Sequence, residues 1–233
     1  MRVGPTSDRR LDAAVGASLA WYEAVFDVHR IPTRCEGGLW RALGEPPRWH
    51  SAAKTVQPDV PAAAVVSAME PFESGSVADS YANLDLDGHG FRQLFRATWL
   101  FRAAPAGPGP SWPDGWTVVS DDDELSAWNT AQDTTGVLVP ALLHHPRFTF
   151  LVRYAAEQMV AGAVLHRVDD VVDLSNTWSL DDEADQIPSM LRCAEAMYPQ
   201  LPVVGYSRND LLSPYLDAGF SAVGPKVVWV RGN

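Results

Sequence analysis

Cysteine and lysine are scarce in this sequence of 233 residues. It holds two cysteines, Cys35 and Cys193, and only two of its 18 lysine and arginine residues are lysines, Lys54 and Lys226. The cysteine spacing matches neither a metal site nor a disulfide framework, so we expect two reduced, buried thiols. No apolar run has the length of a membrane span, and the N-terminus lacks the hydrophobic segment of a signal peptide. We therefore expect a cytoplasmic protein with no metal and no membrane partner.

Positive charge is in the minority. The formal net charge is −11, from 18 basic and 29 acidic residues. Non-specific binding to nucleic acid draws on clustered lysine and arginine, so this balance argues against a nucleic-acid partner. The 46% of apolar residues is enough for a large core, in one large domain or two small ones. The preference for arginine over lysine, with abundant alanine, proline and glycine, is typical of a GC-rich bacterial genome.

Proline and glycine mark one boundary in the chain. Residues 103–115, AAPAGPGPSWPDG, disfavour both a helix and an interior strand. We place a linker at residues 106–115. It follows an N-terminal α+β domain of residues 1–105 and precedes a second domain of residues 116–233.

The first domain carries two helical patterns and one strand pattern. Apolar spacing predicts, in order, a helix over residues 11–29, a helix over residues 61–69 and a strand over residues 78–86. Residues 35–49 stay unassigned, and residues 91–101 carry features of both helix and strand.

The second domain alternates strands and helices more regularly. The predicted order is a strand over 116–120, a helix, a short helix over 140–143, strands over 148–154, 159–168 and 171–178, a helix from about Pro188, a strand over 202–207, a short helix and a last strand from Phe220. The run from Asp121 to Glu124 suits a helix N-terminus, so we interpret it as a cap and not as a metal site. His144 and His145 have no acid or cysteine at ligand spacing and are interpreted as loop residues.

One motif near the C-terminus carries a family resemblance. Tyr215 stands four residues before Gly219-Phe220, with Val223-Gly224 following, and Gly219 is placed for a left-handed helix cap. This pattern resembles the end of the GNAT acyltransferase domain. The resemblance covers residues 116–231 and implies an α/β (α+β) fold, with a mixed, mostly antiparallel twisted sheet flanked by helices. It also implies an acyl-CoA-dependent N-acyltransferase acting on a small-molecule or protein amine, with Tyr215 as the general acid that protonates the departing thiolate.

The resemblance also implies an acyl-CoA site. Its expected contacts lie on a diverging strand, at the pyrophosphate loop and before the last short helix: Leu174, Ser175, Asn176, Gln186, Ile187, Ser189 and Asn209. Asp173, on the same strand, would bind the acceptor amine or take its proton through water, and the alternative is a solvated aspartate near a turn. For Tyr215 the alternative is a tyrosine packed in the core with its hydroxyl hydrogen-bonded.

The pyrophosphate loop departs from the family pattern. The aligned segment from Glu183 to Pro188 holds no glycine, and Pro188 has no N–H to donate. Asp181, Asp182, Glu183 and Asp185 put negative charge where the phosphates of acetyl-CoA or another acyl-CoA would bind. Two alternatives therefore stay open. One is a non-catalytic GNAT-like domain that binds a small molecule or a protein, and the other is an aminoacyl-tRNA-dependent transferase, which also lacks this loop.

The first half of the chain is left without an assigned role. Residues 11–102 are either a second, diverged GNAT-like half or a lid and dimer surface, so a homodimer is also left open. A linker of this length allows the two halves to share a cleft, which is where ligands tend to bind.

Overall fold

One sheet runs through the whole molecule. The computed structural model describes residues 8–181 and 183–232, and over these residues the sheet has 11 strands in the order β1-β2-β3-β4-β11-β5-β10-β9-β8-β7-β6. The strands are β1 (Thr33–Glu36), β2 (Leu39–Ala42), β3 (Ala53–Thr55), β4 (Gly75–Asp79), β5 (Phe91–Arg102), β6 (Trp116–Val118), β7 (Phe148–Ala155), β8 (Gln158–Val168), β9 (Val171–Ser179), β10 (Val203–Arg208) and β11 (Ser221–Arg231). The helices are α1 (Arg9–Val28), α2 (Ala62–Ala68), η1 (Asp87–His89), α3 (Asp122–Gln132), α4 (Pro140–Leu143), α5 (Glu183–Met197), η2 (Asn209–Leu211) and α6 (Ser213–Asp217). None of these described helices is long and apolar enough to cross a membrane.

The two halves of the chain share this sheet. β11 pairs antiparallel with both β4 and β5, so the last strand lies between two strands of the first half. Parallel pairing links β3 with β4 and β9 with β10, and the other neighbours are antiparallel. The predicted α/β fold with a mostly antiparallel sheet is confirmed, as is the element order after residue 116. The division into two domains at residues 106–115 stays a prediction.

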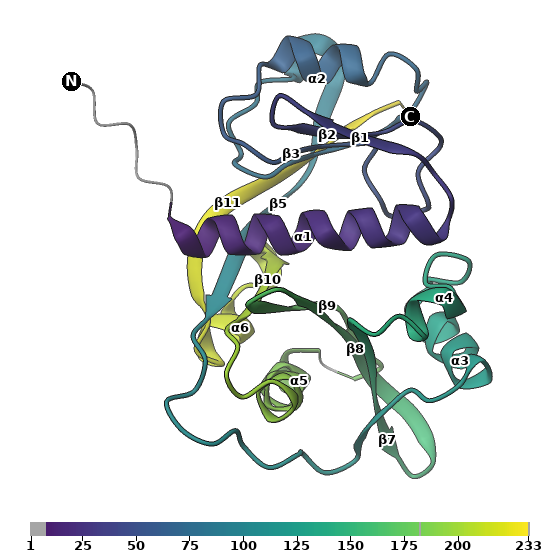
Figure 1. The fold of residues 1–233 in the computed structure, drawn as a ribbon, viewed down its shortest axis with the longest axis vertical. Coiled ribbons are helices and arrows are strands. Elements are labelled where there is room, and N and C mark those ends of the chain that lie inside the picture. Colours follow the sequence, from purple (N-terminus) through teal and green to yellow (C-terminus); the bar gives the residue numbers. More distant parts are fainter. Residues whose placement is uncertain (1–7, 182, 233) are drawn as a thin grey trace.

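Helix α1 lies across the middle of the molecule, with β1–β3 and α2 on one side and β7–β9 on the other (Figure 1). The Asp8 side chain caps it by accepting a hydrogen bond from the backbone N of Arg10 at 3.0 Å. Its apolar side packs Ala14, Val15 and Ala17 against the sheet face that carries Trp99 and Val204.

Helix α5 covers a separate apolar cluster of the sheet. Ile187, Met190 and Leu191 pack there with Leu174 of β9 and Val203 of β10. Because successive strand residues point to opposite faces, Val203 faces α5 whereas Val204 faces α1. The sheet between these two helices therefore has one face towards each.

The predicted start of α5 is wrong. The helix begins at Glu183, so Pro188 lies inside it and not in its first turn. Proline there loses one backbone hydrogen bond, but Ile187 on the same stretch is only 1% exposed. Burial of this apolar stripe outweighs the local preference of proline.

Two other expectations differ from the structure, and one assignment left open is resolved. The strand predicted over residues 78–86 ends at Asp79, whose carboxylate accepts hydrogen bonds from the backbone N of Tyr81 at 3.2 Å and of Leu84 at 2.9 Å and so bends the chain. Residues 91–101, which fitted helix and strand, form the single strand β5. Cys35, expected to be buried, is exposed, whereas Cys193 is buried.

Candidate active site

The parallel strands β9 and β10 diverge at the centre of the sheet. They pair at Val172 with Val203 and at Asp173 with Val204, and over the described length of both strands no further pair follows. A Cβ on Gly205 would lie 2.7 Å from the carbonyl oxygen of Leu174, so only glycine allows this close approach where the strands separate. Beyond that point their facing backbone groups are available to a ligand.

A β-bulge distorts β9 just after the divergence. The register with β8 shifts between the pairs Gly162–Trp178 and Val164–Ser175, which leaves an extra residue on β9. Asn176 in this bulge has a φ of 50°, a left-handed conformation that asparagine tolerates better than most residues. The bulge turns the backbone of Asn176 away from the regular ladder, beside the diverging strands.

A cavity of about 310 Å³ opens here, between α1 and the diverging strands. The predicted residues Asp173, Leu174, Ser175, Asn176 and Tyr215 all line it. The other predicted contacts lie outside its lining: Gln186, Ile187, Ser189 and Asn209. The structure thus brings together the predicted residues of β9 and α6 at this cavity, and it does not bring the α5 residues or Asn209 to it.

Tyr215 is packed in the core, as the alternative to its predicted general-acid role described, and the general-acid role stays a prediction. It is 8% exposed and packs edge-on against Phe220, with ring centroids 5.8 Å apart. Its hydroxyl also lies 3.1 Å from Thr177 Oγ1, next to the β9 bulge. The tyrosine is part of the core, and it also lines the cavity.

Asp173 is buried at 5% exposure, so its alternative description as a solvated aspartate is wrong. Burial raises the pKa of its carboxyl to about 6, although a hydrogen bond with Ser175 and the nearby Lys226 and Lys54 oppose the rise. A carboxylate with this pKa can exchange a proton close to neutral pH.

Solved structures share the overall fold, although no protein-family model and no curated protein matches the sequence. A GCN5-related N-acetyltransferase from Kribbella flavida is 17% identical and superposes with a TM-score of 0.65 over 94% of this chain and 96% of that one. The chain has the GNAT fold. An acetyltransferase assigned to the GNAT family from Novosphingobium aromaticivorans is also 17% identical, with a TM-score of 0.62 over 97% and 100% of the two chains.

The likeness to solved structures extends over both halves of the chain. A conserved protein of unknown function from Staphylococcus epidermidis, 14% identical, gives a TM-score of 0.66 over 87% of this chain and 94% of that one. The resemblance found in the sequence covered only residues 116–231. The first half therefore belongs to the same overall architecture, which its short strands β1–β3 did not reveal.

The start of α5, where the resemblance places the phosphates of an acyl-CoA, is acidic. Asp181 and Asp185 are exposed beside the start of α5, and Ile187 is part of the core. Asp182 and the side chains of Glu183 and Ala184 lie outside the described residues. The negative charge at the start of α5 would oppose a pyrophosphate there.

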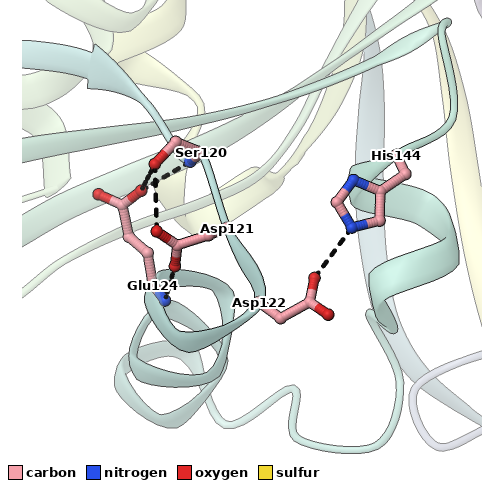
Figure 2. Close-up of polar contacts among 5 residues, drawn as sticks. All are labelled: Ser120, Asp121, Asp122, Glu124 and His144. Atoms are coloured by element: carbon pink, nitrogen blue, oxygen red, sulfur yellow. Dashed lines mark hydrogen bonds and ion pairs between the residues drawn. The ribbon is translucent and has the colours of Figure 1, made fainter.

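The acid run at α3 has the capping role predicted from the sequence (Figure 2). The Asp121 carboxylate accepts a hydrogen bond from the backbone N of Glu124 at 2.9 Å, and Glu124 Oε2 accepts one from the backbone N of Ser120 at 2.7 Å. His144 Nε2 lies 3.0 Å from Asp122 Oδ1 at the surface. Among the residues that the structure describes, no group of His, Cys, Asp and Glu is arranged to hold a metal.

The cavity wall contributed by α1 and the loop before β3 was not predicted. His50 there is neutral, since its Nε2 accepts a hydrogen bond from Trp21 Nε1 and its Nδ1 donates one to the Arg48 carbonyl, both at 3.1 Å. Burial lowers the pKa of His50 to about 4, so it is unsuited to act as a base at neutral pH. Trp49 at the rim is 67% exposed, has a φ of 68° and donates from Nε1 to the Asp133 carbonyl.

Both lysines of the chain also lie behind this wall, which sequence reasoning missed. Lys54 is 0% and Lys226 is 2% exposed. A usable signal was present in the sequence: both stand among small or β-branched residues, in Ala53-Lys54-Thr55 and Lys226-Val227-Val228, where a lysine interrupts a buried strand.

Proposed function

We propose that this protein is an acyl-CoA-dependent N-acyltransferase that acylates a primary amine. The observation that carries the proposal is the cavity at the divergence of β9 and β10, lined by the Tyr215 side chain and the Asp173 carboxylate within a GNAT fold. A small-molecule acceptor, a cytoplasmic location and a bacterial source belong to the same proposal. A homodimer stays a prediction.

The two strands and the cavity have separate tasks in this proposal. The pantetheine arm of the acyl donor lies between β9 and β10, where their unpaired backbone groups donate and accept hydrogen bonds. The Asn176 bulge lies beside the thioester, where a backbone N–H is suited to stabilise the oxyanion that forms on attack. The acceptor amine enters from the α1 side, towards Asp173.

The reaction then needs two proton movements. Asp173 holds the ammonium group of the acceptor, which must lose one proton before its nitrogen attacks the thioester carbon. As the C–N bond forms and the C–S bond breaks, the Tyr215 hydroxyl protonates the departing thiolate. Contact with Thr177 fixes the orientation of that hydroxyl.

The acidic start of α5 argues for weak binding of the phosphate groups. In the proposed complex most of the binding comes from pantetheine between the strands, and Asp181 and Asp185 reduce the affinity for the nucleotide end. This predicts a high KM for acyl-CoA, because the phosphate end is bound weakly. It predicts no matching loss of kcat, because the thioester end is bound in the reacting geometry.

Calorimetry and acyl transfer assays test the proposal. We expect heat of binding and a raised Tm with millimolar acetyl-CoA, and release of free thiol when an amine panel is added. Tyr215→Phe should lower kcat by about 10²–10⁴-fold. Tyr198→Phe, in a partly buried tyrosine of the same α5-side cluster that does not line the cavity, is the matched control and should keep its activity.

Other outcomes would favour the alternatives. Absence of both heat and stabilisation at millimolar acetyl-CoA would overturn the proposal and favour a binding domain that has lost catalysis. Transfer from an aminoacyl-tRNA, with none from acyl-CoA, would favour the tRNA-dependent transferase. Equal turnover by wild type and Tyr215→Phe would remove Tyr215 from the mechanism.

A further inference from the structure

The two buried lysines lie under the cavity wall. Lys54 projects from β3 and Lys226 from β11, and both side chains lie in the layer between the sheet and α1. Burying an ammonium group without a close carboxylate is costly. Over the described residues neither lysine forms an ion pair within 4.0 Å. Because both are buried, neither lysine contributes to the charge of the surface, and their position beside the cavity points to a role there.

Lys54 is connected to the cavity through α1. Its Nζ lies 3.0 Å from Ser18 Oγ, and Ser18 lines the cavity. This contact works in either direction. A charged Lys54 donates to the serine oxygen, and a neutral Lys54 accepts from the serine hydroxyl.

The surroundings of Lys54 favour its neutral form. The rings of Tyr22 and Trp99 lie 5.3 and 5.2 Å from Nζ, and they leave little room for water. Burial lowers the pKa of Lys54 to about 7, and the charge of Asp173 opposes that change. A lysine amine with such a pKa is a competent general base at neutral pH.

The ionisable groups around Lys54 come from strands and from α1. They are Asp173 of β9, Lys226 of β11 and Tyr22 of α1, and the ring of Tyr206 of β10 lies beyond, 3.5 Å from Lys226 Nζ. Burial, and then the proximity of Lys54, lower the pKa of Lys226 well below its ordinary value. A charge on Lys54 therefore disfavours a proton on Lys226, and the charge of Asp173 favours a proton on either lysine.

We propose that Lys54 is the general base for the acceptor amine and that Ser18 relays the proton to it. This rests on the proposed acyl transfer. The acceptor ammonium passes one proton to Ser18 Oγ while the Ser18 hydroxyl proton passes to Lys54 Nζ, so a free amine and a Lys54 ammonium result. The amine then attacks the thioester and its second proton replaces the one that Tyr215 gives to the thiolate. Lys54 returns its proton to solvent by the same path.

Asp173 has a complementary part in this arrangement. Its carboxylate holds the acceptor ammonium before the transfer and stabilises the Lys54 ammonium after it, since the negative charge favours a proton on either nitrogen. A single buried carboxylate thus supports both ends of the relay. The relay also restricts the acceptor to amines that are protonated in solution and small enough to reach Ser18.

Rate profiles against pH test the relay. Lys54→Met should lower kcat by about 10²–10⁴-fold at pH 7.5 without changing the KM for acyl-CoA, because the donor lies on the other side of the divergence. Its remaining rate should rise about tenfold per pH unit as the fraction of free amine in solution rises. Lys226→Met, with the same chemical change in the same layer, should retain activity within a few-fold. Equal profiles for wild type and Lys54→Met would overturn the proposal.

A spectroscopic titration tests Lys54 without any substrate. With carbon-13-labelled lysine the chain gives two side-chain signals, and Lys226→Met assigns them. We expect the Lys54 signal to titrate near neutral pH. A Lys54 that stays charged above pH 9 cannot accept the proton, and that result would overturn the relay even if acyl transfer is found. Absence of acyl transfer in the wild type, with Lys54 titrating as expected, would instead count against the proposed function.

Discussion

The two faces of the sheet at β9 and β10 are equally buried but differ in chemistry. On the α5 face, Leu174 and Val203 pack against Met190, which is 0% exposed. On the α1 face, at similar depth, lie Asp173 and the layer that holds Lys54. Neighbouring residues of one strand thus serve two different environments. The α5 face stabilises the fold, whereas the α1 face holds buried charge next to a cavity, as active sites do.

The position of the cavity follows from this difference. An apolar face can be packed to solid density, so α5 lies directly on the strands. A face with buried charges needs polar partners nearby, and here the cavity lies beside Asp173. Gly205 and the Asn176 bulge allow β9 and β10 to diverge. The cavity then opens on the α1 face, beside Asp173.

The largest expected effect lies on the apolar face. Met190→Ala removes a fully buried side chain of α5 and should lower the free energy of unfolding by about 2–5 kcal/mol. Its matched control is Met197→Ala, the same change in a partly buried methionine at the end of the same helix, which should cost less. Urea unfolding measures both. The comparison of faces breaks down if Met190→Ala shifts the pH profile of the reaction instead of stability.

A second prediction concerns the charged face and the pH dependence of stability. The folded pKa of Lys54 is lowered to about 7, so between pH 7 and 8.5 the unfolded chain binds more protons than the folded one. The free energy of unfolding should therefore rise with pH, by about 1 kcal/mol per pH unit for each such lysine. Burial raises the pKa of the Cys193 thiol to about 12, so at higher pH the folded chain keeps a proton that the unfolded chain loses. This makes the free energy of unfolding fall with pH, and it therefore sets the upper limit of the pH range for the measurement.

Replacing the lysines should reveal this dependence. Lys54→Met keeps an unbranched side chain, one atom shorter and without the charge. It should raise stability at pH 7 by about 1–3 kcal/mol, since an uncompensated buried charge is replaced by an apolar group. The rise of the free energy of unfolding with pH should be smaller in Lys54→Met, and it should be absent in the double variant that also carries Lys226→Met. An unchanged slope in the double variant would show that the lysines are not the source, and the two faces would then differ less than we argue.

The sequence predicted the apolar face better than the charged one. Strands and helices after residue 116 follow from periodicity, and the Tyr215 to Phe220 motif identified the end of the fold. The strands β1, β2 and β3 have three or four residues each, too few for a period to be visible. Without them, nothing in the sequence indicates that Lys54 lies next to Ser18 or Asp173.

The charged site was hidden for a topological reason. Lys54, Asp173 and Lys226 come from β3, β9 and β11, and they meet because β11 enters the sheet between β4 and β5 and α1 covers the result. Such an insertion depends on the order of strands in space, which residue patterns do not encode. The start of α5 was missed for a local reason, since burial of Ile187 outweighs the helix-breaking tendency of Pro188.

The smallest expected effect concerns the surface at the start of α5, where the proposal places the phosphate end of the donor. Asp185→Asn removes one exposed negative charge near the start of α5, so acetyl-CoA should bind a few-fold more tightly at low salt, or about 0.5–1 kcal/mol. The gain should shrink as ionic strength rises, because exposed charges are screened. Asp87→Asn, an exposed aspartate at the start of η1, is the matched control and should bind like wild type. Calorimetry at two salt concentrations measures both variants. If Asp185→Asn leaves the affinity unchanged at low salt, the phosphates do not lie at α5, and the donor then enters this fold by a route other than the one its GNAT architecture implies.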